Sequence, residues 1–366
     1  MPFKHLFDIP SSITYLNTPG NGILPKSNRR WREERERRFF DLHGDLRDQQ
    51  PAFIQSVRED IGKIFKACTT RVFCTPNFSF GYNVLLDRLP SSYKYLLLDE
   101  DYPSLNYPIV NRNLNYKTVK IDEHLEQNIL KAIREYQPDV LLLSIVQYIT
   151  GIKIDLAFIR QLKQDNPKLI IIADGTQFLG TEPFHFDQSG FDAVGTSGYK
   201  WLMAGFGNGF MLLSEHLTNL MNEELHDRPS PKEAMWASKS MLQTFFEPGH
   251  QDTLSHGTLQ QSILFLQETG LENVQKHIHS ISAFAHEELA KRNLLLPAVV
   301  GRSVRSSLIN IQIAPKHYTD LTANDIKCFP RGTGIRIGLH LYNTHWDIEK
   351  LLGILDTYNI QGNYEI

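Results

Sequence analysis

A lysine and an aspartate, 26 residues apart, are the two side chains whose types and spacing point most clearly to chemistry. Asp174 ends the apolar run 168–173, and Lys200 follows a second short run, 191–194, within a Ser-x-Tyr-Lys cluster. A lysine can form an imine with an aldehyde, and an acid can keep a ring nitrogen protonated. A hydroxyl beside the lysine can bind a phosphate. Together these are the parts that a pyridoxal phosphate (PLP) site needs.

The elements that must position these residues alternate along the first part of the chain. Short apolar runs with amphipathic stretches between them are typical of a mostly parallel sheet covered by helices on both faces. Polar clusters recur just after strand ends, where open α/β sheets bind ligands. The sequence predicts strands at 72–75, 95–99, 115–119, 140–146, 168–173, 191–194 and 209–213, and helices at 84–89, 123–136 and 156–164.

The pattern of alternating apolar runs and amphipathic stretches ends after about residue 215. Residues 223–248 carry aromatic, proline and charged residues and read as a long irregular connection, and 259–287 is strongly helical. Alternating strands at 307–313 and 334–339 and a helix at 347–358 complete an α+β tail. We therefore expect an N-terminal segment (1–20), a large cofactor-binding domain (21–255) and a smaller C-terminal α+β domain (256–366).

Composition narrows the class of protein. The 366 residues are 41% hydrophobic and 22% charged, with a net charge of −3, which gives no indication of a nucleic-acid partner. The start has no apolar leader and no run reaches transmembrane length, so a cytoplasmic protein without a membrane partner is expected. Residues 27–40 hold six arginines and three glutamates and read as a helix with a solvated face. Three cysteines, an odd number, fit reduced thiols, and no metal site is expected.

With these residues in view, the chain resembles fold type I PLP-dependent enzymes, specifically the class V aminotransferase family. That family includes cysteine desulfurases, kynureninase-like lyases, isopenicillin-epimerase-like proteins and several transaminases. The resemblance runs from the Tyr-Leu-Asn-Thr-Pro-Gly-Asn-Gly motif at 15–22 to the Arg-Ile-Gly-Leu-His-Leu-Tyr-Asn-Thr motif at 336–344. Its specific part is the combination of Asp174-x-x-Gln177 with Ser197-x-Tyr199-Lys200.

The resemblance implies a role for each residue at the ring of the cofactor. Lys200 would form the Schiff base and move protons at the substrate Cα, and Asp174 would hold the pyridine nitrogen protonated. Gln177 and Gln147 fall at positions that contact the O3′ oxygen, and the ring of Tyr102 would stack on the pyridine. The alternatives are an exposed lysine, a strand-end acid, a surface glutamine and a buried core tyrosine.

The phosphate needs donors at a helix N-terminus. Asn77, Phe78 and Ser79 resemble the phosphate-binding turn of the family, although relatives usually have a small residue or threonine in place of the phenylalanine. Ser197 and Tyr199 occupy the positions of a phosphate-binding hydroxyl and of a His or Tyr. An ordinary helix cap at Ser79 is the competing interpretation.

Further positions bear on the substrate and on the partner subunit. Gly257 and Thr258 resemble a Gly-Thr pair that reaches the phosphate of the neighbouring subunit, which implies a homodimer with a shared active site. Thr258 as a helix cap is the alternative. Arg336 matches the arginine that grips the substrate α-carboxylate, unless it is an ordinary surface-strand arginine, and Asn17 lies in the segment that lines the substrate side.

The function we expect is that of an aminotransferase acting on a small amino acid or amine, because transamination needs no additional nucleophile. A lyase or epimerase of the same family and a PLP-fold protein that binds without turnover remain open. A desulfurase is less favoured because Cys328, the only candidate thiol in the C-terminal domain, reads as part of a strand or its end. An NAD(P)-dependent enzyme is disfavoured by the lack of a glycine fingerprint.

Overall fold

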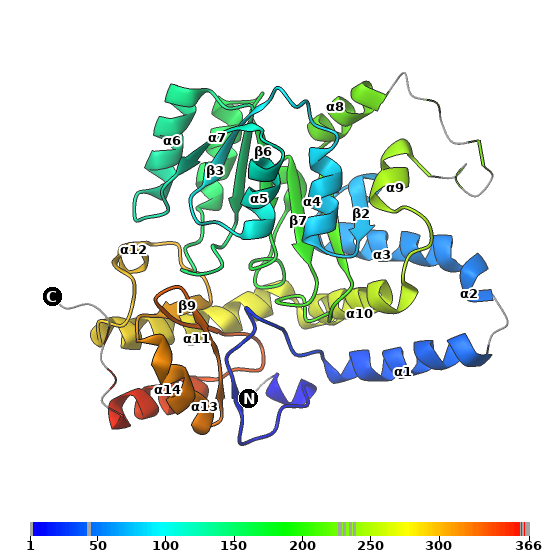
Figure 1. Cartoon of the computed structure of the whole chain (residues 1–366). Helices are drawn as coiled ribbons and strands as arrows, with labels where there is room; N and C mark the ends of the chain where they lie inside the picture. The colour runs from blue at the N-terminus through cyan, green and yellow to red at the C-terminus, as the bar shows by residue number, and fades with distance from the viewer. Residues whose placement is uncertain are drawn as a thin grey trace.

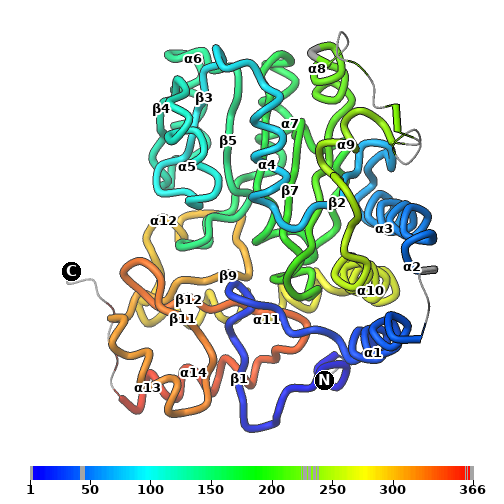
Figure 2. Tube along the Cα trace, turned by 45° about the vertical axis from the view of Figure 1, so that its right-hand side comes forward, coloured from blue at the N-terminus to red at the C-terminus, as the bar shows by residue number. Residues whose placement is uncertain are grey.

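The computed structural model describes residues 3–41, 45–225 and 239–358, together with 229, 232, 233, 236, 360 and 362. Its centre is a seven-stranded sheet in the order β2-β8-β7-β6-β5-β3-β4 (Figures 1 and 2). The contacts from β7 through β6, β5 and β3 to β4 are parallel, and β8 is antiparallel to both of its neighbours. The strands are β2 (Val72–Thr75), β3 (Lys94–Leu98), β4 (Asn115–Val119), β5 (Val140–Ser144), β6 (Ile170–Asp174), β7 (Ala193–Ser197) and β8 (Gly209–Leu213).

Helices cover both faces of this sheet because successive strand residues point to opposite sides. In β5, Leu141 and Leu143 belong to one core cluster, whereas Val140 and Leu142 belong to another. The first cluster includes residues of α3 (Gln50–Phe65), α6 (Leu125–Tyr136), α7 (Leu156–Asp165) and α10 (Thr253–Thr269). The second includes residues of α4 (Phe78–Leu86), α5 (Pro103–Asn111), α8 (Glu215–Leu225) and α9 (Met241–Phe246). The predicted mostly parallel sheet between helices is confirmed.

A second, smaller sheet follows near the C-terminal end of the chain. Its order is β11-β12-β9, all antiparallel, with β9 (Leu308–Ile311), β11 (Phe329–Arg331) and β12 (Gly334–Gly338). The apolar core of this part is separate from the two clusters of the large sheet. It includes residues of α11 (Leu271–Lys291), α13 (Tyr318–Ala323) and α14 (His345–Thr357), and α12 (Pro297–Val300) lies nearby in the chain.

The N-terminal segment lies beside this smaller sheet (Figures 1 and 2). Strand β1 (Thr14–Tyr15) pairs in parallel with β10 (Ile326–Lys327), and Asn17 forms an isolated bridge with Gly338. Helix α10 crosses the expected boundary at 255–256 and packs on α3 and on α1 (Lys26–Asp41). The boundaries of the three predicted segments stay a prediction.

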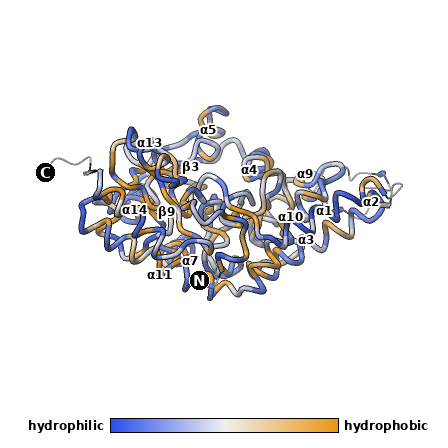
Figure 3. The backbone as a smooth tube through the Cα atoms, turned by 90° about the horizontal axis from the view of Figure 1, so that it is seen from below, coloured by the Kyte–Doolittle hydropathy of each residue, from blue (hydrophilic) through white to orange (hydrophobic). Residues whose placement is uncertain are grey.

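Several predicted elements differ from the structure. The helix expected at 84–89 is α4, which begins at Phe78, just after its cap Asn77, and ends at Leu86. The helical stretch expected at 259–287 is two helices, because Gly270 takes a φ of +80° and both ends α10 and starts α11. The irregular connection expected at 223–248 contains helix α9, where Ser240 and Gln243 form a capping box, and much of the rest lies outside the described residues. The expected charged helix is α1, whose trace is largely hydrophilic (Figure 3). Among the described helices, none combines the length and apolar character needed to cross a membrane.

Candidate active site

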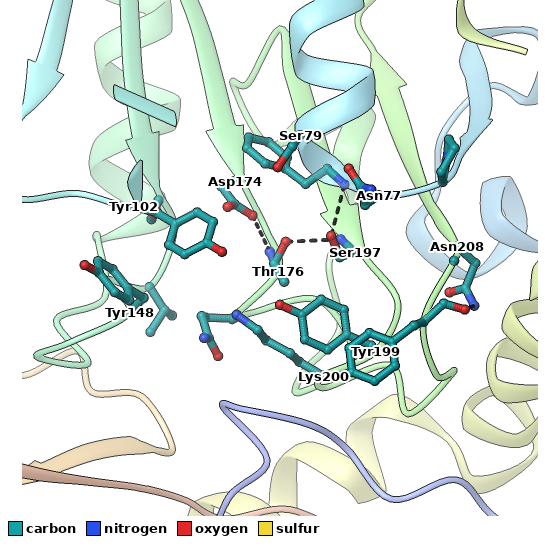
Figure 4. A pocket seen from close by; sticks show the side chains of 17 residues that line it. Asn77, Ser79, Tyr102, Tyr148, Asp174, Thr176, Ser197, Tyr199, Lys200 and Asn208 are labelled. Carbon is teal, nitrogen blue, oxygen red and sulfur yellow. Dashed lines mark hydrogen bonds between the residues drawn. The ribbon is translucent and has the colours of Figure 1, made fainter. Parts of the chain in front are cut away.

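A cavity of about 360 Å³ lies where β5, β6 and β7 end. Each of these strands delivers its last residue to the wall, namely Ser144, Asp174 and Ser197. This is the edge at which parallel sheets bind ligands. The lining consists of Pro76, Asn77, Phe78, Ser79, Tyr102, Ser144, Val146, Tyr148, Asp174, Thr176, Gln177, Ser197, Tyr199, Lys200, Phe206, Gly207 and Asn208 (Figure 4).

Lys200 is buried in this cavity between two aromatic rings. Its Nζ lies 5.5 Å from the ring centre of Tyr102 and 5.3 Å from that of Tyr199. Burial lowers the pKa of Lys200 to about 8, against the opposing effect of the Asp174 charge. The amine therefore reaches its neutral, nucleophilic form near physiological pH more readily than an exposed lysine does.

Asp174 is the one acid among the described residues that line the cavity. Burial raises the pKa of its carboxyl to about 6, although the N–H of Thr176 donates to Oδ1 at 2.8 Å and the Lys200 charge favours ionisation. A carboxyl with this pKa holds or releases a proton within the physiological range. It is suited to share a proton with a ring nitrogen.

The other end of the cavity is built around the N-terminus of α4. Asn77 caps this helix, with its Oδ1 accepting the Phe80 N–H at 2.9 Å. The Phe78 N–H donates to Ser197 Oγ at 3.0 Å, and the Ser197 N–H donates to Thr176 Oγ1 at 3.1 Å. Backbone N–H groups and hydroxyls at a helix N-terminus form an anion site.

The phenylalanine at position 78 is compatible with such a site because its ring points elsewhere. The ring stacks on Tyr82 with centroids 5.4 Å apart and belongs to the second core cluster. Its backbone N–H donates to Ser197 Oγ. Replacement of a small residue by phenylalanine at this position therefore leaves the donor in place.

Tyr102 starts helix α5 and is held by the residue before it. Buried Asp101 accepts the Tyr102 N–H at 2.7 Å, and it also accepts the N–H and the hydroxyl of Ser144 at 2.7 and 2.6 Å. The Tyr102 ring meets the ring of Tyr148 edge-on at 5.1 Å. Tyr148, Thr176 and Asn208 line the cavity and were missed by the sequence reasoning; the only signal for Tyr148 was its place just after a buried strand.

The two glutamines predicted to contact the O3′ oxygen, Gln177 and Gln147, make different hydrogen bonds in the structure. Gln177 lines the cavity, but its Nε2 donates to the Pro19 carbonyl at 3.1 Å and its Oε1 accepts from Trp201 Nε1 at 2.7 Å. Gln147 is not among the lining residues. Its Oε1 accepts the N–H groups of Ile149 and Thr150, so it shapes the loop that presents Tyr148. A contact of either amide with the cofactor stays a prediction.

Arg336 and Asn17 are not among the described residues that line the cavity. Arg336, on β12, is 3% exposed and donates from Nη1 to the Tyr148 carbonyl at 2.7 Å, while its Nε finds no partner among the described residues. Burial, followed by the charge of Arg331, lowers the pKa of Arg336 to about 10. The Asn17 Oδ1 is buried and likewise unpaired within the described chain. The substrate-binding role of both residues stays a prediction.

Gly257 and Thr258 are not among the described residues that line the cavity of this chain. They are inside α10, where a Cβ at position 257 would be 2.0 Å from Trp31 on α1. The Thr258 hydroxyl donates to the Leu254 carbonyl at 2.7 Å and accepts from Arg32 at 2.8 Å. Thr258 is not a helix cap because Asp252 caps α10, and the reach of this pair to the phosphate of a neighbouring subunit stays a prediction. The homodimer stays a prediction.

The thiol that a desulfurase would need is not at the cavity. Cys328 lies between β10 and β11, is 3% exposed, and burial raises its pKa to about 12.

The strands β11 and β12 are joined by the two-residue turn Gly332–Thr333, since Arg331 pairs with Gly334. Within the described residues there is also no group of three potential metal ligands.

Comparison with known proteins identifies the class that this fold and site define. The model of the family described as aminotransferase class-V matches residues 110–351, which is more than half of the chain. The chain therefore belongs to the class-V aminotransferase family of fold type I PLP-dependent enzymes. This membership confirms the predicted family, and with it pyridoxal phosphate as the cofactor.

Solved structures with the same fold cover nearly all of the chain. A cysteine desulfurase from Thermococcus onnurineus NA1 is 14% identical, with 98% of each chain covered and a TM-score of 0.82. A variant of C-DES with glycine covalently linked to its PLP cofactor is 17% identical, with 97% of this chain and 99% of that chain covered and a TM-score of 0.83. The cysteine desulfurase CsdA from Escherichia coli is 16% identical, with 97% and 96% covered and a TM-score of 0.76.

Proposed function

We propose that this protein is a PLP-dependent lyase that binds a small α-amino acid and eliminates a substituent from its Cβ. The observation that supports this proposal most directly is the placement of Lys200 in one cavity with three phenols, Tyr102, Tyr148 and Tyr199. The lysine can remove a proton, and a phenol can donate one to a leaving group. C-DES, which has the same fold, is described as a cystine C–S lyase.

The cavity suits the cofactor in charge and in chemistry. Lys200 offers an amine, Asp174 offers a carboxyl that can share a proton, and the N-terminus of α4 with Ser197 offers phosphate donors. A Cβ added at Gly198 would fall 2.0 Å from Asn208 Oδ1, and this oxygen is buried and unpaired within the described chain. Pyridoxal phosphate, when bound, supplies an aldehyde for the amine and an electron sink for Cα.

In the proposed elimination, each of these protein groups has a defined role. Asp174 would hold the proton of the ring nitrogen, and the Phe78 N–H and Ser197 hydroxyl would hold the phosphate. Lys200 takes the proton from the substrate Cα, for which its lowered pKa is suited. Burial raises the pKa of Tyr148, so its hydroxyl stays protonated and can donate to the departing group. Arg336 holds the α-carboxylate.

The overall reaction balances without a protein thiol. A substrate with a leaving group X on Cβ loses HX, and addition of water then yields a 2-oxo acid and ammonia. Buried Cys328 is not needed to accept X. This distinguishes the proposal from a desulfurase that carries sulfur on its own cysteine.

Transamination is the second candidate, because the matching family model is described by that activity and Lys200 alone could move the proton. It would transfer the amino group to an added 2-oxo acid instead of releasing ammonia. The rest of the site would serve both reactions.

One assay separates the two candidates. The PLP-loaded protein is incubated with amino acids that carry a Cβ leaving group, with and without an added 2-oxo acid, and ammonia and the new amino acid are both measured. Ammonia released without an acceptor supports the lyase. Acceptor-dependent formation of a new amino acid, without free ammonia, would replace the lyase by an aminotransferase. Neither product from any amino acid would reject both.

A further inference from the structure

The hairpin β11–β12 turns one face toward the cavity and the other toward the small apolar core. Phe329 pairs with Arg336, and Arg331 pairs with Gly334. Paired residues lie on the same face of an antiparallel ladder, and so do residues two apart along a strand. Arg331 and Arg336 therefore share a face, whereas Ile335 and Ile337 point into the core of the C-terminal part.

The shared face is the one that meets the large sheet. Arg336 donates to the Tyr148 carbonyl at 2.7 Å, and Tyr148 lines the cavity. Since Arg331 projects from the same face, two residues along from the partner of Arg336, its side chain starts about 7 Å farther along the hairpin. Opposite it, a Cβ at Gly334 would meet Asn310 Oδ1 at 2.1 Å, so the neighbouring strand β9 closes that side of the hairpin.

The hairpin is tied to the loop that carries Tyr148. Asn310, on the neighbouring strand β9, donates from Nδ2 to both the Ile149 carbonyl and the Arg331 carbonyl, at 3.0 Å each. A Cβ at Gly332 would lie 2.8 Å from the Ile149 side chain. The backbone of Arg331 is thus fixed beside the rim of the cavity.

The charge of Arg331 has no carboxylate partner among the described residues. Its side chain is exposed, and the guanidinium carbon lies 4.8 Å from the ring centre of Phe329. Burial lowers the pKa of Lys200 and Arg336, and the charge of Arg331 adds to the lowering; burial raises the pKa of Tyr148, and the same charge opposes it, as expected of a cation whose field reaches the cavity. Arg336 and Arg331 therefore form two cationic positions at one rim, while the described lining contributes a single acid, Asp174.

We propose that Arg331 receives a second acidic group of the substrate, so that the substrate is an α-amino acid with an acidic side chain. The inference rests on the proposed function, in which Arg336 holds the α-carboxylate. A neutral side chain would leave the rim charge of Arg331 unmatched. An acidic group can accept two parallel hydrogen bonds from the guanidinium. The position of Arg331 near the solvent limits the expected gain to about tenfold in affinity.

Binding of unreactive acids tests this without turnover. Glutarate and pentanoate have five carbons each and no amino group, but glutarate has two carboxylates. Their dissociation constants are measured by calorimetry on the PLP-loaded protein at low ionic strength. Glutarate is expected to bind about tenfold more tightly than pentanoate. Arg331→Gln should remove that preference while leaving the cofactor absorbance unchanged, and Arg331→Lys should retain part of it.

Two further variants make the result specific. Arg30→Gln removes an exposed arginine of α1 and should keep the preference for glutarate. Arg336→Gln should weaken both acids together. Equal affinities of the wild type for the two acids would overturn the inference, as would a glutarate preference that survives in Arg331→Gln. If the purified protein takes up no PLP at all, the proposed function fails instead.

Discussion

Asp101 binds Ser144 twice, accepting its backbone N–H at 2.7 Å and its hydroxyl at 2.6 Å. This one carboxylate joins the end of β5 to the start of α5, where it also accepts the N–H of Tyr102 at 2.7 Å. The side chain is buried, and burial raises its pKa despite these three donors. Asp101 is thus a positioning residue for the ring of Tyr102 above Lys200.

Replacing this carboxylate should disturb both stability and the site. In Asp101→Asn the amide NH₂ replaces one acceptor oxygen and faces a donor, so we expect a loss of about 1–3 kcal/mol in the free energy of unfolding. Denaturant unfolding measures this loss, and the affinity for PLP should fall with it. Asp99→Asn, two residues earlier and exposed, is the matched control and should change neither quantity. A fully stable Asp101→Asn protein would contradict the assignment.

The raised pKa of Asp174 predicts a pH dependence of stability in the cofactor-free protein. The folded carboxyl has a pKa of about 6, against an ordinary value of 3.8. Between these values the native state binds more protons than the unfolded state, so stability falls as the pH rises from about 4 to 6. At pH 7.5, Asp174→Asn should therefore unfold with up to about 3 kcal/mol more free energy than the wild type.

Thermal or urea unfolding at pH 4 and at pH 7.5 checks this expectation. The advantage of Asp174→Asn should shrink toward zero at the lower pH, where the wild-type carboxyl is protonated. An equal difference at both values would show that ionisation of Asp174 is not its cause. Loss of catalytic turnover in the same variant, with PLP bound, would be consistent with its role at the ring nitrogen.

Lys200→Ala should remove the covalent link to the cofactor. The wild type is expected to retain PLP through denaturation after borohydride reduction, and the variant is not. Lys168→Ala, at an exposed lysine, is the control and should behave like the wild type. A reduced, protein-bound adduct that persists in Lys200→Ala would mean that another lysine carries the cofactor.

Tyr148→Phe tests the proton donor. If the Tyr148 hydroxyl protonates the leaving group, ammonia release should slow by about 100-fold or more, with little effect on the affinity for PLP. Substrates whose leaving group needs no proton should be affected much less. Equal slowing with every leaving group would indicate a role in packing against Tyr102 rather than in proton transfer.

Cys328→Ala should leave the turnover number within about twofold of the wild type, because the thiol is buried and its pKa is raised to about 12. The matched variant Cys74→Ala alters a second buried thiol. Steady-state kinetics with both proteins provides the comparison. A collapse of turnover in Cys328→Ala alone, in a protein that is fully folded, would restore a thiol-dependent desulfurase as a candidate.

The large sheet and its lysine could be predicted because both follow from local patterns. Buried parallel strands are continuous apolar runs, and the residues that end them must meet at one edge, so Asp174 and Ser197 could be placed together. The C-terminal helical stretch was predicted as one helix because a single glycine, Gly270, did not outweigh the apolar period on either side. In the structure the positive φ of Gly270 separates this stretch into two helices.

Other parts of the site depend on contacts that no local pattern reveals. Tyr148 reaches the cavity because Gln147 folds its loop and because Arg336, far away in the sequence, holds its carbonyl. Gly257 and Thr258 fit a motif in type and order, yet tertiary packing on Trp31 and Arg32 buries them. Motif spacing does not reveal these contacts, and the reach of the pair to a neighbouring subunit stays a prediction.

The short turn Gly332–Thr333 also bears on how this scaffold could acquire new activities. It joins two strands beside the rim of the cavity, and a φ of +57° at Gly332 makes the connection as brief as a hairpin allows. Insertions in exposed turns cost little free energy. A longer segment placed here, such as one bearing a thiol, could extend over the opening while the buried strands keep their register. Directed evolution by loop insertion at this turn is therefore a route to altered chemistry that avoids redesign of the core.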